Sequence, residues 1–568
     1  MMTTRRALLA GAAALAATPA FAVIEASPAR LFLQASGKRD YGPAIDAILA
    51  AARAELAASG LPGMIVALTD DEGFSATLCI GWADLTARLP VGPDHLFEIG
   101  SISKSLTALA LWRLAAEGRI DLSAPIARYL PQGLVPPEPI STLQLLDHVS
   151  GLPNFAAVPP HTPDGRLWVG PKPGARFYYS NTGYELAGLI IDAVAGRPHP
   201  EVIRETVLRP IGMKHADAHI RYAHRPRMAT GYIARTDLTP MFGAPLVEGS
   251  WTEESLAAGA VVATADDMAA YLCYVIALGR GAGGPLFPDA TAKAMLADSV
   301  EAKEIGGRYS SGFMRLAIDD RPTLHHTGGM LLFSSSFDVD APAGVGAFAS
   351  VNGILAEHRP TGVTAFALRA LRAVREGKPL PAAPDPFAPR RVAKPERFAG
   401  RWVAADGKSL EIRKSVGGTG ADLVVEGRTG RLEAIGGMLM TDLPGYTSFP
   451  FEFAASGKAE EAPLDRLWHG DRLYARDAAP APQPAAPARL RLLAGGYRAP
   501  NRWVGDFDVV IRDGGLAIPG LGALVEDKRG FWRTAEDKEG QERFLFDTLI
   551  AGRPYRMLFS GQDCVRID

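Results

Sequence analysis

Apolar residues follow two different periods along the first part of the chain. Between Tyr41 and Ser59 they recur at helical spacing, which predicts an amphipathic helix that ends at Leu61-Pro62-Gly63. Shorter apolar runs at Met64–Thr69 and Ser75–Ile80 lie on either side of the turn residues Asp70-Asp71-Glu72-Gly73. These two runs predict a hairpin of two strands.

Helical spacing returns after Ser101 and continues through Leu114, with Gly118 as the predicted stop. The other elements predicted in this region are helices over Gly183–Ala195 and Thr361–Arg375 and strands over Ser334–Val339 and Val345–Val351. This mixed order predicts an α/β (α+β) domain, residues 38–377, in which helices cover an antiparallel sheet.

Two proline-rich stretches divide the rest of the chain. Residues 378–395 and 478–488 are predicted to be exposed linkers, because proline and alanine without apolar periodicity do not build a core. They separate the predicted catalytic domain from a second unit, residues 396–477, and that unit from a third, residues 489–568.

The last two units resemble each other. Phe398-Ala399-Gly400-Arg401-Trp402 corresponds to Leu493-Ala494-Gly495-Gly496-Tyr497, and Arg466-Leu467-Trp468-His469-Gly470 corresponds more loosely to Met557-Leu558-Phe559-Ser560-Gly561. Short alternating apolar runs with glycine turns lie between these ends. One unit used twice, as two small antiparallel β-barrels, is the prediction.

Composition narrows the class of protein. The chain has 568 residues, 47% of them hydrophobic, which is enough for several domains with real cores. Lys and Arg total 60 against 62 acidic residues, and no basic run or basic–aromatic stripe occurs, so a nucleic-acid partner is not supported. Three cysteines, Cys79, Cys273 and Cys564, cannot form a disulfide framework and are predicted to be buried free thiols.

The first 22 residues have the pattern of an export signal. Thr4-Arg5-Arg6 precedes an apolar, alanine-rich run over Ala7–Ala17, and Ala20-Phe21-Ala22 offers a cleavage site. The paired arginines fit a twin-arginine signal, and a Sec signal is the alternative. A periplasmic or secreted protein follows, with no stable membrane insertion after the signal is removed.

The most informative local motif is Ser101-Ile102-Ser103-Lys104, at the start of a predicted helix. Spacing of three places the hydroxyl and the amine on one face of a helical turn. A basic amine and a helix N-terminus can activate a serine as a nucleophile. Alone, the same pattern also fits a helix cap followed by a solvated lysine.

Two further motifs decide between these readings. Tyr179-Ser180-Asn181 and His326-Thr327-Gly328-Gly329 follow Ser101 and Lys104 in that order. With flanking segments such as Asp147-His148-Val149-Ser150-Gly151, the chain resembles the penicillin-recognising serine hydrolases: class C β-lactamases, D-alanyl-D-alanine carboxypeptidases, D-aminopeptidases and related esterases. The resemblance implies a β-lactamase-like catalytic domain with a mostly helical subdomain, which the segment around His148 helps to shape. The D-aminopeptidases are similar in layout too, with a catalytic domain followed by two barrels.

The resemblance implies a role for each motif residue. Ser101 would be the nucleophile, with Lys104 and Tyr179 moving its proton. Asn181 would hold Lys104 and a substrate carbonyl. The segment His326-Thr327-Gly328-Gly329 would form an edge strand for substrate, and the backbone N–H groups of Ser101 and Gly329 an oxyanion hole. From the residues themselves, we expect burial to lower the pKa of Lys104, and a cation beside Tyr179 to favour its phenolate.

His326 departs from the pattern of the β-lactamases and carboxypeptidases, which usually carry lysine there. Histidine is largely neutral near pH 7, so the requirement for an anionic substrate is relaxed. This favours a peptidase, amidase or esterase. No metal or cofactor is expected, because His215, His219 and His224 lie in a loop without a convincing further ligand. No Gly-x-Ser-x-Gly elbow occurs, which removes the α/β-hydrolase alternative.

The sequence therefore predicts an exported serine hydrolase that acts through an acyl-enzyme on a small peptide or amide, similar to a D-aminopeptidase. The alternatives are a carboxylesterase, then a β-lactamase or D-Ala-D-Ala carboxypeptidase. A non-enzymatic binder of peptidoglycan or peptide is the rival from another class. Self-association into a homo-oligomer, and a role of the barrels in gating the site, are left open.

Overall fold

The structure is a computed structural model, and it describes residues 32–568 apart from 163, 235–240, 356, 416–419, 456–461, 502–503 and 551. The predicted signal peptide, residues 1–22, lies outside the described residues. No helix in the described part of the chain is both long enough and apolar enough to cross a membrane.

The centre of the molecule is a ten-stranded sheet in the order β1-β3-β2-β14-β13-β12-β11-β10-β9, with β4 paired to β3. All of its neighbouring strands are antiparallel, as predicted. The strands of this part of the chain are β1 Phe32–Ser36, β2 Gly63–Asp70, β3 Ser75–Asp84, β4 Leu89–Pro90, β5 Phe97–Glu98, β6 Tyr232–Ala234, β7 Leu246–Glu248, β8 Val262–Ala263, β9 Val300–Ala302, β10 Gly307–Ser310, β11 Phe313–Ile318, β12 Arg321–Met330, β13 Phe333–Asp340, β14 Val345–Val351 and β15 Gly353–Ile354.

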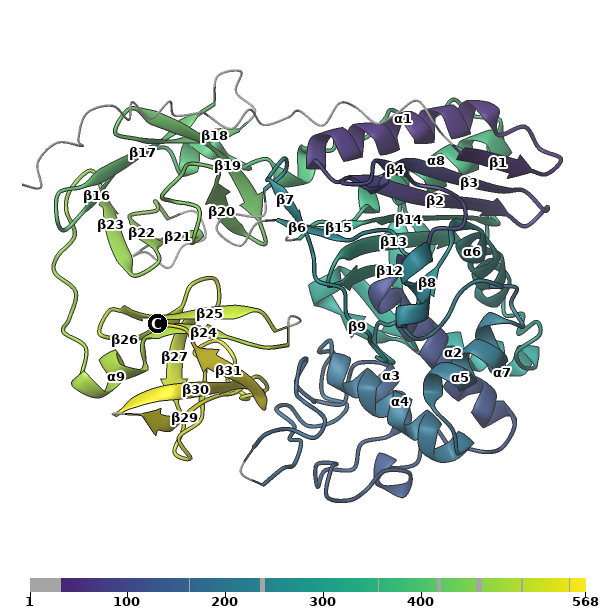
Figure 1. Cartoon of the computed structure of the whole chain (residues 1–568), viewed down its shortest axis with the longest axis horizontal. Coiled ribbons are helices and arrows are strands. Elements are labelled where there is room, and N and C mark those ends of the chain that lie inside the picture. Colours follow the sequence, from purple (N-terminus) through teal and green to yellow (C-terminus); the bar gives the residue numbers. More distant parts are fainter. Residues whose placement is uncertain are drawn as a thin grey trace, which may run out of the picture.

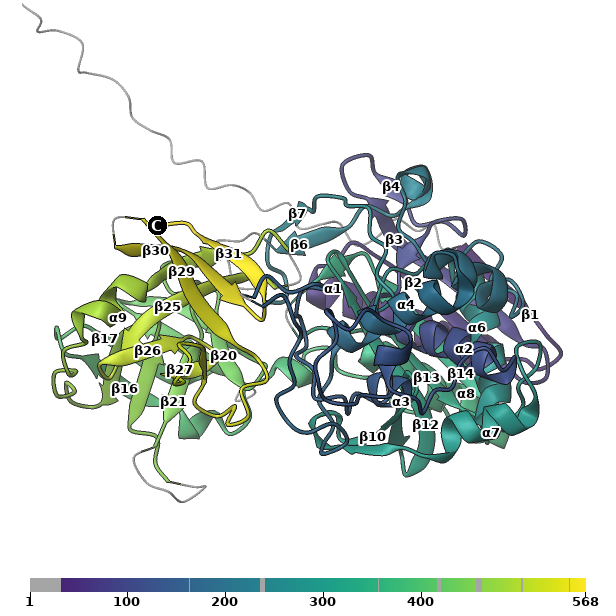
Figure 2. The same cartoon turned by 90° about the horizontal axis from the view of Figure 1, so that it is seen from below.

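Helices cover both faces of this sheet (Figures 1 and 2). The α-helices are α1 Gly42–Ser59, α2 Ser103–Ala116, α3 Thr142–Leu146, α4 Asn181–Ala195, α5 His199–Ile203, α6 Ala265–Gly279, α7 Asp289–Ala297, α8 Thr361–Glu376 and, between the barrels, α9 Ala488–Leu493. Short 3₁₀ or π turns are η1 Gly100–Ile102, η2 Ile126–Arg128, η3 Arg204–Leu208, η4 Tyr222–Arg227, η5 Lys303–Ile305, η6 Ala388–Arg390 and η7 Pro395–Arg397.

Strand β2 shows why the sheet has two covered faces. Met64, Val66 and Leu68 belong to the core under α1 and α8, whereas Ile65 and Ala67 belong to the core shared with α2 and α6. Side chains alternate between faces along a strand, so a run that is apolar throughout must be buried on both sides. The helices on the second face include α2 and α4, which carry Lys104 and Asn181.

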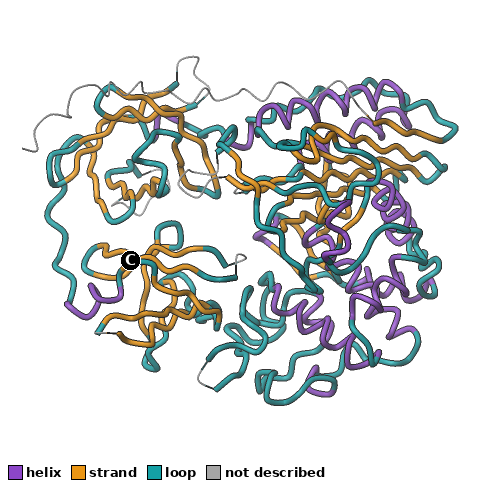
Figure 3. Tube along the Cα trace, viewed as in Figure 1, coloured by secondary structure: helices purple, strands orange, loops and turns teal. Residues whose placement is uncertain are grey.

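The last part of the chain forms two closed barrels of eight strands each, which contain little helix (Figure 3). The first consists of β16 Gly400–Ala404, β17 Ser409–Lys414, β18 Ala421–Val425, β19 Arg428–Ile435, β20 Met438–Thr441, β21 Phe451–Ala454, β22 Arg466–His469 and β23 Arg472–Arg476. The second consists of β24 Gly495–Arg498, β25 Asp506–Arg512, β26 Gly515–Ile518, β27 Gly522–Glu526, β28 Trp532–Thr534, β29 Phe544–Ile550, β30 Arg553–Phe559 and β31 Gln562–Arg566.

The repeat predicted from the sequence reappears in atomic detail. Trp402 is fully buried in one barrel and donates its indole N–H to the Phe398 carbonyl at 3.1 Å. Tyr497 is fully buried in the other and donates its hydroxyl to the Leu493 carbonyl at 2.8 Å. Each aromatic side chain thus fills its barrel and also satisfies a carbonyl four residues earlier. The prediction of two small antiparallel barrels is confirmed.

Two predictions about exposure are wrong. The proline-rich stretch 378–395 is not exposed throughout, since Arg390 and Val392 are both buried. The Arg390 guanidinium stacks on Phe242 at 4.6 Å and lies 3.5 Å from the carboxylate of Glu433, which fixes this stretch against both neighbouring units. Cys273 is exposed rather than buried, because it lies off the face of α6 that packs into the core.

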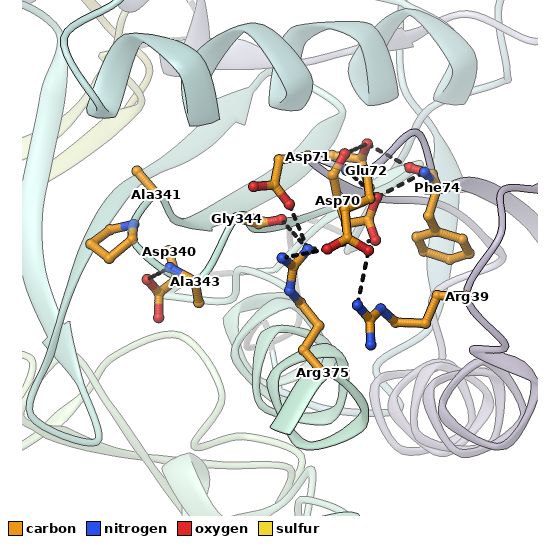
Figure 4. A network of polar contacts seen from close by, with 12 residues as sticks. Arg39, Asp70, Asp71, Glu72, Phe74, Asp340, Ala341, Ala343, Gly344 and Arg375 are labelled. Atoms are coloured by element: carbon orange, nitrogen blue, oxygen red, sulfur yellow. Dashed lines mark hydrogen bonds and ion pairs between the residues drawn. The ribbon is translucent and has the colours of Figure 1, made fainter. Parts of the chain in front are cut away.

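A cluster of charged side chains surrounds the turn between β2 and β3, at one end of the sheet (Figure 4). Arg375 of α8 reaches the hairpin turn, 2.5 Å from the carboxylate of Asp71 and 3.3 Å from that of Glu72. Asp70 accepts hydrogen bonds from the backbone N–H groups of Glu72 and Phe74, each at 2.8 Å, which fixes the turn. The cluster ties α8 to β2 and β3 and contains none of the predicted site residues.

Candidate active site

The predicted serine and lysine lie where a strand gives way to a helix. The pairing of β5 with β8 and a hydrogen bond from Ser335 Oγ to the Ile99 carbonyl, 2.8 Å, hold the segment before Ser101. Ser101 lies in the 3₁₀ turn η1, which continues directly into α2. Lys104 therefore follows Ser101 by one turn on the same face, as the spacing predicted.

The Lys104 amine is fully buried, and its contacts define its chemistry. Its Nζ lies 3.0 Å from Ser101 Oγ, 2.7 Å from Asn181 Oδ1 and 2.9 Å from the Ala258 carbonyl oxygen. Burial lowers the pKa of Lys104 to about 7. A neutral amine has two N–H groups and one lone pair. Because the two carbonyl-type oxygens can only accept, they take both N–H groups and leave the lone pair for the Ser101 hydroxyl.

The amide of Asn181 is itself fixed by a residue that sequence reasoning missed. Asn154 Oδ1 accepts from Asn181 Nδ2 at 2.9 Å and from its backbone N–H at 3.1 Å. This contact orients the Asn181 side chain, so its oxygen faces Lys104. In the sequence, the available sign of this role was the position of Asn154 directly after the Gly151-Leu152-Pro153 turn.

Tyr179 lies beside this pair in an aromatic enclosure. Lys104 Nζ is 4.9 Å from the centroid of its ring, and the His148 ring packs on it at 4.2 Å between centroids. His148 accepts a hydrogen bond from the Ser180 backbone N–H at 3.0 Å, which fixes the strand-like turn that carries Tyr179. His148, which the sequence assigned only to the shape of the helical region, thus supports the site.

The expectation that Tyr179 would be a phenolate is wrong. Burial raises the pKa of its hydroxyl well above the usual value, and the nearby Ser101 and Arg359 only partly oppose this effect. Because Lys104 is buried too and holds its proton weakly, it does not supply the fixed positive charge that the expectation required.

His326-Thr327-Gly328-Gly329 lies on β12, which is not an edge strand of the sheet as a whole. β12 pairs with β13 on one side and with β11 on the other. The ladder with β11, however, ends at the pair Met314 and His325, while the ladder with β13 continues to Met330. The end of β12 is therefore open on one side, and only this part corresponds to the predicted edge.

The glycines of β12 allow it to approach the nucleophile. A Cβ added at Gly328 would lie 2.0 Å from the Ile99 carbonyl oxygen and 2.1 Å from Ser335 Oγ. A Cβ added at Gly100 would lie 2.6 Å from the backbone nitrogen of Gly329. The backbone N–H groups of Ser101 and Gly329 thus come from two segments in direct contact, as an oxyanion hole requires.

His326 is neutral in this setting. Burial lowers its pKa to about 3. Its Nδ1 lies 2.6 Å from the Thr327 carbonyl and its Nε2 lies 3.1 Å from the Tyr309 hydroxyl, so a single N–H and one lone pair satisfy both partners. The fixed charge of a lysine at this position is absent, as the sequence predicted.

A cation that the sequence did not reveal lies close by. The guanidinium of Arg359 faces Gly329, since a Cβ built there would come within 2.3 Å of it. Burial lowers the pKa of Arg359, and the carboxylate of Glu357 opposes this shift only in part. Arg359 lies between β15 and α8, far along the chain from every motif, so no spacing pointed to it.

The second barrel contacts the loop that holds Asn154. Glu542, just before β29, accepts from the Asn154 backbone N–H at 2.6 Å and from the Tyr178 hydroxyl at 2.9 Å. Its other oxygen accepts from Ser560 Oγ at 2.5 Å. The barrel therefore supports residues adjacent to both Asn181 and Tyr179.

A cavity of about 290 Å³ opens beside Ser101 and Asn181, between α4 and the loop after Leu152, with Asn501 and Gln562 of the second barrel in its wall.

The structure brings Ser101, Lys104, Tyr179, Asn181 and His326 together, and Gly329 next to Ser101. Such an arrangement can form and hydrolyse an ester on serine without an added group. In the described residues, no group of three or more His, Cys, Asp or Glu side chains could hold a metal ion.

Residues 47–365, more than half of the chain, match the family model described as Beta-lactamase. "Protein flp" of Staphylococcus aureus (strain MW2) is 29% identical over 171 residues, which are 27% of this chain and 34% of that protein. A "Beta-lactamase" of Providencia stuartii is 28% identical over 179 residues, 30% of this chain and 46% of that protein. The chain spans less than half the length of either relative.

Solved structures are similar over more of the chain. The octameric penicillin-binding protein homologue from Pyrococcus abyssi covers 76% of this chain and 99% of its own, at 22% identity and a TM-score of 0.51. The D-amino acid amidase from Ochrobactrum anthropi SV3, complexed with D-phenylalanine, covers 59% of this chain and 100% of its own, at 26% identity and a TM-score of 0.48. The first likeness shows the fold.

Proposed function

Because this chain belongs to the beta-lactamase family, we propose that it is a serine hydrolase that works through an acyl-enzyme on Ser101. One observation carries the proposal. The Lys104 amine is buried, 3.0 Å from Ser101 Oγ, with both of its N–H groups directed to Asn181 and Ala258. In that environment the Lys104 amine is neutral, and its lone pair is directed at the Ser101 hydroxyl. A lysine with a purely structural role does not require this arrangement.

Acylation then follows from the geometry. Ser101 Oγ attacks the carbonyl carbon of the substrate and gives its proton to Lys104 Nζ, while the N–H groups of Ser101 and Gly329 stabilise the oxyanion. Tyr179, a neutral phenol, donates its proton to the departing group and recovers one from Lys104. Water then attacks the ester carbon and gives a proton to Lys104. When the bond to Ser101 Oγ breaks, Oγ takes that proton from Lys104, and the carboxylic acid product departs.

Amides and small peptides are the proposed substrates, as in a D-aminopeptidase. A neutral His326 makes no demand for an anion beside the scissile bond, and the cavity of about 290 Å³ accommodates a single residue-sized group. Arg359, beside Gly329, supplies a positive charge next to the proposed oxyanion donor, which suits a substrate with a carboxylate on its leaving group. Carboxylesterase activity is the alternative.

Export and the division of the chain belong to the same proposal. We assign residues 1–22 to a signal peptide, 38–377 to the catalytic domain, and 396–477 and 489–568 to the barrels, joined by 378–395 and 478–488. Recovery of the mature protein from the periplasm or medium of its host, with its N-terminus at Val23, supports this assignment. An intact Met1 terminus there contradicts it.

A fluorophosphonate probe and a substrate panel test the activity. Wild-type protein should be labelled on Ser101 and should turn over p-nitrophenyl acetate and D-alanine p-nitroanilide, whereas Ser101→Ala should do neither. The Ser103→Ala protein is the matched control, because Ser103 is the neighbouring buried serine whose hydroxyl bonds to the Val261 backbone. Equal labelling of wild type and Ser101→Ala, or no turnover of any ester, amide or β-lactam, overturns the proposal and favours a binding protein.

A further inference from the structure

The cavity beside Ser101 contains a carboxylate that the proposed mechanism does not use. Most of its lining is apolar, with Phe155, Ala156, Val158, Leu189 and Leu256 among the residues. Glu185 also lines it, on α4 one turn after Asn181. A charged group in an apolar cavity costs free energy unless something compensates it, so its presence needs a reason.

The compensation that Glu185 receives is incomplete. Its carboxylate accepts hydrogen bonds from the backbone N–H groups of Ala258, at 3.1 Å to Oε1, and of Ala257. Burial raises the pKa of this carboxyl to about 7, and these N–H groups, His199 and Lys104 only partly counter the effect. Among the residues described, no Lys, Arg or His nitrogen forms an ion pair with Glu185 within 4.0 Å. A positive charge in direct contact with this carboxylate would therefore come from a bound molecule.

A second polar group of the cavity also lacks a partner. His199 is only 8% exposed and lines the same cavity, and its ring packs against the α4 backbone at Gly188. Its Nδ1 lies 3.1 Å from Asp192 Oδ1, so that nitrogen carries the hydrogen and Nε2 carries the lone pair. Nε2 has no hydrogen-bond partner among the described residues.

A carboxylate without an ion pair and an acceptor nitrogen without a hydrogen-bond partner, in one largely apolar cavity, match the same chemical group. A primary ammonium offers a positive charge and three N–H donors, whereas an amide, hydroxyl or carboxylate lacks one or both. We propose that this cavity binds the acyl residue of the substrate by its free amino group, with the ammonium against Glu185 and an N–H donated to His199. The apolar wall then contacts the side chain of that residue.

This inference rests on the proposed function and narrows its substrate class. The substrate would be an amino acid amide or a short peptide with an unblocked amino terminus, cleaved after its first residue. An N-acylated substrate would bury an uncharged amide against Glu185 and leave the carboxylate unpaired. Selection for the free amine is therefore built into the acyl side of the site.

Binding to Ser101→Ala protein tests the inference without turnover. Isothermal titration should show that D-alaninamide binds at least about tenfold more tightly than N-acetyl-D-alaninamide, as a charge-assisted contact implies. Adding Glu185→Gln, which still accepts the Ala258 hydrogen bond, should abolish that preference. Glu254→Gln is the matched control: this half-buried carboxylate lies just before the same loop but does not line the cavity.

Three results would overturn the inference: equal affinity for the two amides, no binding of either, or the same weakening of both by Glu185→Gln. The last result would make Glu185 a counter-charge for Lys104 alone. Failure of the proposed function is recognised separately, because wild-type protein would then hydrolyse no p-nitrophenyl acetate, a substrate that has no amino group.

Discussion

At the residue scale, the structure decides which group holds the proton. The sequence predicted that a serine, a lysine, a tyrosine and an asparagine would meet, and the geometry agrees. It also predicted that burial would lower the pKa of Lys104, but not that burial would raise the pKa of Tyr179, because the burial of that phenol depends on residues far away in the chain. The base we propose is therefore the amine rather than the phenol.

The pH dependence of the activity follows from Lys104. Below pH 7 its amine, with a pKa of about 7, is protonated and has no lone pair for Ser101. We expect kcat/KM for p-nitrophenyl acetate to rise about tenfold per pH unit up to pH 7 and then to level off. A pH–rate profile at constant ionic strength measures this, and a rate that stays constant down to pH 5 contradicts it.

Replacing Tyr179 separates its role from that of Lys104. An amide nitrogen must be protonated to leave, whereas p-nitrophenolate leaves unaided. Tyr179→Phe should therefore lower kcat for D-alanine p-nitroanilide by about 10²-fold or more and affect p-nitrophenyl acetate far less. Pre-steady-state acylation rates on the two substrates provide the measurement. Equal losses on both would make Tyr179 the base instead.

At the element scale, the sequence predicted those helices and strands in which apolar residues recur at a strong helical or strand period. The helix after Gly42 and the hairpin of β2 and β3 appear almost at the predicted positions. The predicted edge strand was only partly right, because the sequence does not reveal where the ladder between β11 and β12 stops. The pairing register of strands that lie far apart in the chain is set by packing, and the local sequence pattern does not reveal it.

The contact between β12 and the turn η1 leads to a prediction about Gly328. An alanine methyl there would meet the Ile99 carbonyl at 2.0 Å, so β12 and η1 must separate. Gly328→Ala should reduce kcat/KM about 10²-fold or more by displacing an oxyanion donor. Gly362→Ala, where a Cβ meets nothing within 4 Å, is the control. Unchanged activity in Gly328→Ala would show that the backbone of β12 and η1 can shift without displacing the oxyanion donor.

At the scale of the whole molecule, the second barrel acts as a support for the site. Glu542 holds the Asn154 backbone, Asn154 holds Asn181, and Asn181 holds Lys104, each through a hydrogen bond of 2.6–2.9 Å. No sequence pattern indicated this chain of contacts, since 388 positions separate Asn154 from Glu542. The barrels themselves were predictable from their repeat, but where they dock was not.

Glu542 is therefore expected to position the catalytic groups. Glu542→Ala should lower kcat about tenfold to a hundredfold with a smaller change in KM, since a misaligned base slows chemistry more than binding. Glu542→Gln, whose one oxygen still accepts the hydrogen bonds from the Asn154 backbone and the Tyr178 hydroxyl, should restore most of the activity. Glu539→Ala is the matched control, because Glu539 forms an exposed ion pair with Arg176 across the same interface.

Steady-state kinetics and the midpoint of thermal unfolding together check this prediction. A loss of kcat at an unchanged midpoint supports a positioning role. If Glu542→Ala lowers the midpoint and leaves kcat intact, Glu542 serves only to attach the barrel.

The contact between Glu542 and Asn154 also has a consequence for biosynthesis. A ribosome completes the Ser101 and Lys104 helix early, whereas Glu542, which steadies their partners, follows Asn154 by 388 positions. Nascent chains and products terminated before the second barrel would carry every motif and still hydrolyse slowly. The cell would thereby be spared an active hydrolase until the second barrel has been synthesised.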